Sequence, residues 1–543
     1  STVGENVAVG SCAATSNTTG TQNTALGHKA LCSNTIGTCN VAIGYSALMT
    51  SVTACGNVAV GNHALCKNTC GEKNVAVGDC ALLQNTEAWY NVAVGYGALQ
   101  TNTTGEHNIG IGRQPLNFNT TGTMNVAIGR QALYQNTDGH CNTAVGTYAL
   151  NANTEGDFNQ AFGHSALYGN KTGHYNSAIG CGSLQQANSG DHNNAVGLGT
   201  LFSNWGGSGN SAIGRQALAC NTTGCCNDAM GYRALYQNTT GCCNVGIGCG
   251  VMYNHKTGHS NVGIGTHSLY NANSGACNVA IGECALYDNW GGTNNVGIGR
   301  CSLRYNTTGT CNIALGNLAL KANTVGGENF AVGYSSLENN TTGWYNIALG
   351  SQALKKNTTS SYNIALGHSP LWSNTTGDMN IAMGYQSLYS NISGHCNIAL
   401  GRQTLKSSWG GDHNIAMGLY TLCSNTEGNY NTGIGCGVLK ANTTGGYNVG
   451  MGCGALGSNT TGQFNTALGE GTLGANTTAS YNVGIGGYAL DNNTVGDENV
   501  GIGRCALKGA LSGDYNVAIG TTALYSNWGG CQNNAIGLSL IHI

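Results

Sequence analysis

The chain has 543 residues, a formal net charge of −3 and 8% charged residues, about a third of the charged share of an ordinary domain. Its 19 Lys and Arg are scattered without a basic stripe, which argues against nucleic-acid binding, and no run of 18 apolar residues could span a membrane. The 88 Gly do not recur at every third residue, which excludes collagen, and 41% apolar residues at regular positions argue for a packed core.

A repeat of 17 residues runs through the chain. Steps of 17 from Asn6 to Asn533 give 32 positions, all of them Asn, and Gly follows four residues after each. Leu follows eight residues after each, except at Ala14, Met252 and Ile541. The consensus is Asn-x-Ala-(Ile/Val/Leu)-Gly-x-x-Ala-Leu-x-x-Asn-Thr-Thr-Gly-x-x, whose residues we number as places 1 to 17. A fixed period of this length indicates a repeat architecture.

The same elements are predicted in every repeat, from the one that begins at Asn6 to the one that begins at Asn533. Places 1–5 alternate and are rich in β-branched residues, which predicts a strand. Gly at place 5 predicts a corner, a short second strand follows, and Asn-Thr-Thr-Gly predicts another corner because Asn tolerates left-handed backbone and Gly adopts positive φ. Seventeen residues cannot hold two packed helices. The prediction is an all-β chain, a β-solenoid (parallel β-roll) of about 32 coils, rod-shaped, with a length of roughly 150 Å.

The repeat predicts one continuous solenoid over residues 1–537. Stacking places like residues above one another, and we expect the Leu of place 9 and the Ile or Val of place 4 to form buried columns. The Asn of place 1 is predicted to form an amide ladder between coils. Residues 538–543 leave the pattern and resemble the translation of a sequencing adapter, so we interpret them as an artefact; the alternative is a genuine terminal strand.

Cysteines recur at the repeat spacing, which places them one above the other. Neighbouring coils lie ~4.8 Å apart, within the range that a disulfide accepts, so we predict vertical disulfide staples and an oxidising, extracellular setting. Free, buried thiols are the alternative. The candidate pairs are Cys225 with Cys242, Cys226 with Cys243, Cys284 with Cys301, Cys436 with Cys453, and, one step out of register, Cys39 with Cys55.

The Asn-Thr-Thr corner also matches the acceptor pattern for N-glycosylation, although it is equally a good turn sequence. The glycosylation candidates are Asn17, Asn102, Asn119, Asn221, Asn238, Asn306, Asn374, Asn442 and Asn476.

Two further features predict surface contacts. Trp precedes Gly-Gly at the same corner in four repeats, at Trp205, Trp290, Trp409 and Trp528. Exposed Trp is typical of interaction surfaces, although each ring could instead fold over its own turn. Place 17 is often aromatic or Cys, so the solenoid is also predicted to dock sideways along that stripe.

No catalytic constellation is evident. The Gly-Ile-Gly segments belong to the repeat and precede no helix, His-Cys pairs such as His140-Cys141 lack the second half of a zinc site, and carboxylates are sparse. The sequence predicts no enzyme activity, no cofactor and no metal.

The unit resembles known repeats. Asn-x-Ala-Ile-Gly-x-x-Ala is similar to the head repeats of trimeric autotransporter adhesins, and the full unit from Asn346 to Tyr362 is similar to repeats of tail-fibre-like surface proteins. The resemblance implies a left-handed parallel β-roll, a homotrimer and adhesion. The adhesin head units have roughly fourteen residues and few cysteines, unlike this chain.

The hypothesis is therefore an extracellular structural or adhesive fibre at a cell or virion surface, a stiff rod that self-associates as a homotrimer or filament. A cell-surface or glycan target, as for a tail-fibre-like adhesin, is one alternative. An ice-binding solenoid is the other, since Thr columns would form a flat array, although Lys171, Asn188 and Asn273 interrupt them.

Overall fold

The computed structural model describes residues 4–539 and contains only β-strands, turns and bends. The predicted parallel β-solenoid with 17-residue coils is confirmed. No helix capable of crossing a membrane occurs within residues 4–539. Of the segment interpreted as an artefact, residues 540–543 lie outside the described residues, whereas the Ser539 N–H donates to the Thr521 carbonyl, as at this place in other coils.

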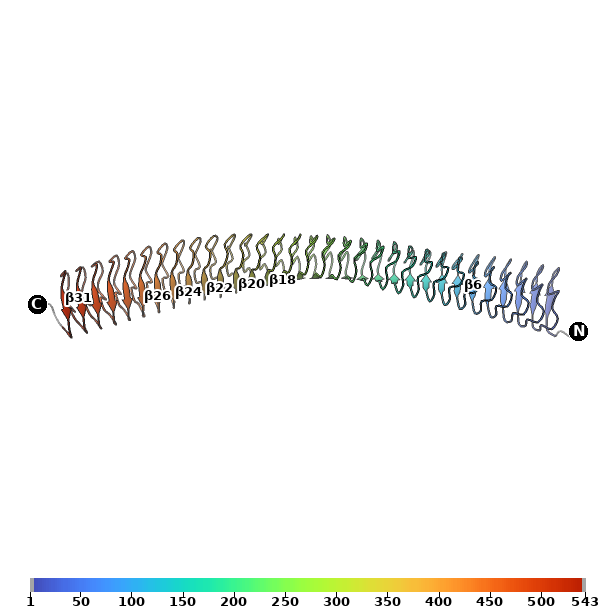
Figure 1. Ribbon diagram of the computed structural model, residues 1–543, viewed down its shortest axis with the longest axis horizontal. Helices are drawn as coiled ribbons and strands as arrows, with labels where there is room; N and C mark the ends of the chain where they lie inside the picture. The colour runs from blue at the N-terminus through green and yellow to red at the C-terminus, as the bar shows by residue number, and fades with distance from the viewer. Residues whose placement is uncertain (1–3, 540–543) are drawn as a thin grey trace. The chain divides into compact units, whose positions relative to one another are not determined.

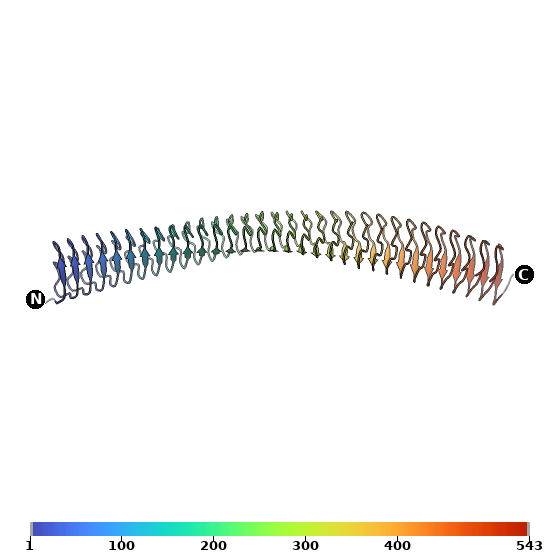
Figure 2. The same cartoon turned by 180° about the vertical axis from the view of Figure 1, so that it is seen from behind.

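The chain divides after Ser274 into two units, each a stack of coils with its strands along one side (Figures 1 and 2). The first unit contains β1 Val7–Val9, β2 Thr24–Leu26, β3 Val41–Ile43, β4 Val58–Val60, β5 Val75–Val77, β6 Val92–Val94, β7 Ile109–Ile111, β8 Val126–Ile128, β9 Thr143–Val145, β10 Gln160–Phe162, β11 Ser177–Ile179, β12 Asn194–Val196, β13 Ser211–Ile213, β14 Asp228–Met230, β15 Val245–Ile247 and β16 Val262–Ile264. The second contains β17 Val279–Ile281, β18 Val296–Ile298, β19 Ile313–Leu315, β20 Phe330–Val332, β21 Ile347–Leu349, β22 Ile364–Leu366, β23 Ile381–Met383, β24 Ile398–Leu400, β25 Ile415–Met417, β26 Thr432–Ile434, β27 Val449–Met451, β28 Thr466–Leu468, β29 Val483–Ile485, β30 Val500–Ile502, β31 Val517–Ile519 and β32 Asn534–Ile536.

Within each unit, successive strands pair in parallel with a register of one repeat. In the pair β3 and β4, for example, Val41 lies beside Val58 and Ala42 beside Ala59. Backbone hydrogen bonds between coils continue outside the strands: the Leu31 N–H donates to the Ala47 carbonyl at 2.9 Å, at places 9 and 8. The coil is therefore held to its neighbours around its whole circumference, which agrees with a repeat that has no insertion between Asn6 and Asn533.

The interior of the coil is narrow and is filled by small residues, Leu and Asn. Ala at places 3 and 8 and Leu at place 9 are fully buried, as Ala42, Ala47 and Leu48 illustrate. The expected burial of the Leu column is confirmed. The expected burial of place 4 is wrong: side chains alternate along a strand, so Ala at place 3 points inward and the larger residue at place 4, such as Leu26, points outward.

The Asn of place 1 forms the predicted ladder. The Oδ1 of Asn40 accepts the backbone N–H of Asn57 at 3.0 Å, and the Nδ2 of Asn57 donates to the Gly71 carbonyl at 2.9 Å. The side chain thus supplies the acceptor for a backbone N–H at the corner and ties the start of the strand to the opposite corner of its own coil. Since these groups are buried, leaving one unpaired would cost about 1–3 kcal/mol.

A second Asn ladder at place 12 was not predicted. The Nδ2 of Asn136 donates to Asn119 Oδ1 at 2.7 Å and to the Gly139 carbonyl at 2.9 Å. The ladder is interrupted where place 12 of the next coil is Ser, Ala or His. Five buried Asn Oδ1 atoms at place 12 have no partner because each precedes such a coil. These five are Asn34, Asn170, Asn238, Asn391 and Asn493, which precede Ser51, Ala187, His255, Ser408 and Ala510.

Left-handed backbone occurs away from the predicted Asn-Thr-Thr-Gly corner. Positive φ is found at places 5, 7, 9 and 17, for example 132° at Gly44, 55° at Ser46 and 50° at Leu48, and neither Asn nor Gly of the Asn-Thr-Thr-Gly corner is among such residues. Place 5 requires Gly for a second reason, because a Cβ on Gly44 would lie 2.4 Å from the Gly61 carbonyl oxygen. The invariant Gly of the repeat therefore reflects both φ and the close approach of adjacent coils.

Restoring the place-12 ladder should stabilise the protein. In Ser408→Asn, the new amide can donate to the unpaired Asn391 Oδ1 and accept from Asn425 Nδ2. We expect the free energy of unfolding to rise by about 1–2 kcal/mol, at about 1 kcal/mol per hydrogen bond, measured by urea denaturation.

The matched control reverses this change at an equivalent corner. Asn204 also precedes Trp-Gly-Gly and accepts from Asn221 at 2.6 Å, so Asn204→Ser should destabilise by a similar amount. Equal stability of wild type and both variants would contradict a contribution from the ladder.

Candidate functional site

The outer side of the sheet in the second unit is an exposed apolar surface. We call the side chains at places 2 and 4 of β17 to β31 the apolar strand face. It contains no charged residue, and its only polar residues are Thr432 and Thr466. Ile298 and Ile347 are each 37% exposed on it. Parallel sheets normally have both faces covered, and long exposed apolar patches mark interaction sites.

The corresponding face of the first unit is interrupted. Five consecutive strands, β10 to β14, have a polar or charged residue at place 2, namely Gln160, Ser177, Asn194, Ser211 and Asp228. The second unit therefore offers the longer unbroken apolar surface.

The predicted aromatic stripe at place 17 consists of stacked rings. Tyr447 lies between Tyr430 and Phe464, with ring centroids 4.9 and 4.8 Å away and interplanar angles of 12° and 6°. His413 and Tyr481 extend this stack at its two ends. The centroid spacing matches the distance between coils, so the stack follows directly from the repeat register.

The four predicted Trp contacts are exposed. Trp205 is 62% and Trp528 70% exposed, and Trp290 and Trp409 are similarly accessible at place 13. In most other coils this place carries Thr, whose hydroxyl donates within the protein, as Thr120 does to the Thr137 carbonyl at 2.9 Å. Those hydroxyl protons are consequently not offered to a surface ligand.

The glycosylation candidates are not exposed as expected. Asn17 is half-buried and the others are fully buried, because all occupy place 12 and their amide nitrogens donate inside the coil. Asn442 Nδ2, for example, donates to Asn425 Oδ1 at 2.8 Å and to Gly445 O at 2.9 Å. A glycan on that nitrogen is incompatible with this packing. The buried candidates are Asn102, Asn119, Asn221, Asn238, Asn306, Asn374, Asn442 and Asn476.

All 25 cysteines are free thiols in the structure. The predicted pair Cys225 and Cys242 is in contact: the Sγ atoms lie 2.9 Å apart, and this hydrogen bond raises the pKa of the Cys225 thiol to about 12. In the predicted pair Cys284 and Cys301, burial and then the neighbouring Cys301 raise the pKa of the Cys284 thiol.

The remaining predicted pairs are exposed or have other partners. Cys226 and Cys243 are exposed at place 17, and Cys436 and Cys453 are exposed at place 6. Cys39 and Cys55 have different partners: the Cys39 thiol donates to Gln22 Oε1 at 3.2 Å, whereas Cys55 Sγ accepts the Thr38 N–H at 3.3 Å. Cys39 and Cys55 therefore occupy neighbouring columns, at places 17 and 16.

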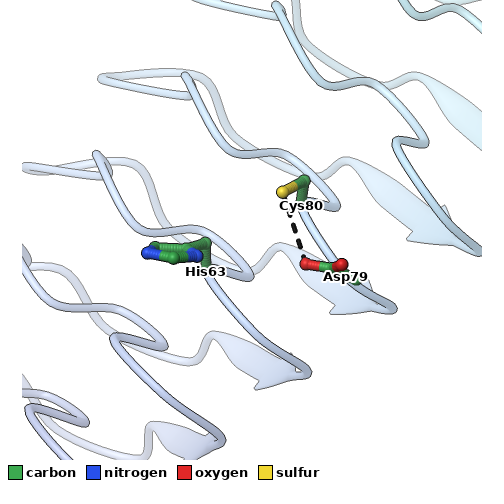
Figure 3. A group of neighbouring side chains, drawn as sticks. All are labelled: His63, Asp79 and Cys80. Carbon is green, nitrogen blue, oxygen red and sulfur yellow. Dashed lines mark hydrogen bonds between the residues drawn. The ribbon is translucent and has the colours of Figure 1, made fainter.

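Sequence reasoning missed one cluster of metal-ligating side chains. His63 at place 7 lies one coil before Asp79 and Cys80, at places 6 and 7, and their ligand atoms are all within 4.8 Å of one another (Figure 3). The Cys80 thiol donates to Asp79 Oδ1 at 3.3 Å. Burial and this hydrogen bond raise the pKa of Cys80 to about 11. The signal was a His and a Cys at the same place in successive repeats.

His255 is the one buried His at place 12. It interrupts the Asn ladder, its Nδ1 donates to the Ala272 carbonyl at 2.5 Å, and its Nε2 lies 3.4 Å from the Asn261 amide nitrogen. This neutral tautomer uses both ring nitrogens. Burial lowers the pKa of His255 below its ordinary value of 6.5.

The fold defines the class: the chain is a β-solenoid repeat protein. No protein-family model matches the chain, and no curated protein matches it.

His255→Asn should change the pH dependence of stability. Because the pKa of His255 is lower in the folded state, the unfolded state takes up the proton at a higher pH. The stability that the neutral ring contributes is therefore fully present above the ordinary pKa of 6.5 and falls as the pH drops. The variant removes that loss and can also pair with Asn238 Oδ1. We expect its gain in free energy of unfolding over wild type to be larger at about pH 5 than at about pH 8, measured by urea denaturation. An equal gain in free energy of unfolding at both pH values would be explained by the added ladder hydrogen bond alone. It would contradict the proposal that protonation of His255 lowers stability.

Proposed function

We propose that this chain is a non-enzymatic structural fibre protein that associates side by side with further copies of itself through the apolar strand face. The uncovered apolar strand face is the observation that carries the proposal. Fifteen successive strands expose Val, Ile, Leu, Met or Phe on a parallel sheet that no further layer of the described second unit covers.

A second copy is the partner that fits this surface. The apolar strand face repeats once per coil, so an identical chain offers apolar side chains at the same spacing along its length. The apolar strand face is also uncharged, so copies can approach without burying unpaired charge. The resemblance to trimeric adhesin heads supports a homotrimer, and a filament of more copies is the alternative arrangement.

We further propose that the mature fibre is extracellular or at a cell or virion surface, where contacting thiols are oxidised to staples. Joining Cys225 to Cys242 forms one S–S bond and releases two protons and two electrons to an oxidant such as oxidised glutathione. Their 2.9 Å contact between coils supports this. Adhesion to a cell-surface or glycan target belongs to the same proposal, with the exposed Trp residues and the ring stack as contact surfaces.

Charge on the apolar strand face should block assembly. In Leu349→Lys/Leu366→Lys/Met383→Lys, three adjacent outward side chains become charged. We expect the wild-type protein to sediment as a multiple of the 55.4 kDa chain and the variant to shift toward the single chain, because buried unpaired charge opposes contact.

The control places the same charges elsewhere on the same coils. Thr359→Lys/Thr376→Lys/Ser393→Lys alters exposed residues at place 14, outside the strands, and should leave the assembled mass unchanged. A wild-type protein that sediments as a single chain at micromolar concentration would contradict the proposal.

Oxidation should link Cys225 to Cys242. After treatment with oxidised glutathione, peptide mapping should recover these two cysteines in one cross-linked species. Cys225→Ser should abolish this species. The control Cys181→Ser should preserve it, because Cys181 has no cysteine at its place in the adjacent coils. Recovery of all 25 thiols after that treatment would rule out staples.

A further inference from the structure

We propose that His63, Asp79 and Cys80 bind a transition-metal ion of the zinc class that joins two adjacent coils. His63 belongs to the coil that begins at Asn57, and Asp79 and Cys80 belong to the coil that begins at Asn74. The two coils pair through β4 and β5 in register, which fixes the backbone positions of the three ligands. This site is independent of the fibre role proposed above.

The geometry suits a single ion. The three ligand atoms come from two coils and lie within 4.8 Å of one another (Figure 3). His63 and Cys80 are half-buried and Asp79 is exposed, so small rotations of the three side chains would bring their ligand atoms to the distances of about 2.0–2.3 Å found around zinc. The His63 ring packs edge-on against Tyr45, with centroids 5.2 Å apart, which restricts its orientation.

The donor set selects the metal. One imidazole nitrogen, one thiolate sulfur and one carboxylate oxygen are the three ligand types that zinc accepts, with a fourth position for water. Calcium and magnesium prefer oxygen ligands throughout, so the thiolate and the imidazole disfavour them. When the ion binds, the Cys80 thiol loses its proton to solvent and the Cys80–Asp79 hydrogen bond is replaced by two bonds to the metal.

Comparable thiols elsewhere in the chain lack this environment. Cys505 also occupies place 7, but Arg504 precedes it and Tyr488 stands at place 7 of the coil before. The stacked pair Cys284 and Cys301 also has a carboxylate beside it, Glu283, but Arg300 pairs with that carboxylate at 3.3 Å, and the charges of Arg300 and Arg304 act on Cys284. Arginines repel a cation, whereas the carboxylate of Asp79 attracts it. Cys505 therefore provides a matched control.

The test is a cobalt and zinc titration of the full chain under reducing conditions. Wild type and Cys505→Ser should both show the thiolate-to-cobalt absorption of a tetrahedral site, displaced by zinc. His63→Gln and Cys80→Ser should each lose this absorption and bind one zinc ion fewer per chain. Asp79→Asn should weaken zinc binding by more than about 100-fold, because loss of even an outer-shell partner costs about 10- to 100-fold.

Circular dichroism spectra in the presence of a chelator show whether the metal-free variants fold. Because the three side chains lie on the coil surface, the variants should retain the wild-type spectrum. Zinc should also raise the melting temperature of wild type and Cys505→Ser but not that of Cys80→Ser. If folded Cys80→Ser binds zinc and cobalt like Cys505→Ser, the proposed site is wrong.

Discussion

The structure depends on strict vertical register, in which every residue lies beside the residue one repeat away. The place-1 Asn enforces this register, because its Oδ1 accepts a backbone N–H from the next coil while its Nδ2 donates to a corner of its own coil, as Asn57 does. A one-residue slip would leave buried amides unpaired along the stack. Asn at this place without exception over 32 repeats is the sequence counterpart of that penalty.

The same register explains the narrow interior and its unusual backbone. Ala at places 3 and 8 leaves room for only one large apolar column, the Leu of place 9, and that Leu has left-handed backbone, with φ near 50° at Leu48. Left-handed backbone disfavours β-branched residues, and within residues 4–539 places 9 and 17 contain no Val, Ile or Thr. The Tyr, His and Cys of place 17 therefore share a conformational requirement as well as a surface.

Function in such a protein arises from columns, because any side chain repeated at one place becomes a row at the coil spacing. The rows include the apolar strand face, the ring stack around Tyr447, and the thiol contact between Cys225 and Cys242. The cluster of His63, Asp79 and Cys80 departs from this pattern, since it combines different residue types from two coils. The surfaces proposed for assembly are thus repeated, whereas the proposed metal site is local.

The repeat alone determined the all-β solenoid, the buried Leu column and the place-1 Asn ladder, because a period of 17 residues without insertions leaves one way to stack like on like. It did not determine which strand residues face inward, since places 2, 3 and 4 are all apolar in most strands, as in Val41-Ala42-Ile43. Only the closed coil, too narrow for Ile, decided that place 4 points outward. Burial of the Asn-Thr-Thr amides and the meeting of His63 with Cys80 were likewise decided in three dimensions. These features depend on side-chain direction and distance across coils, which a linear pattern does not contain.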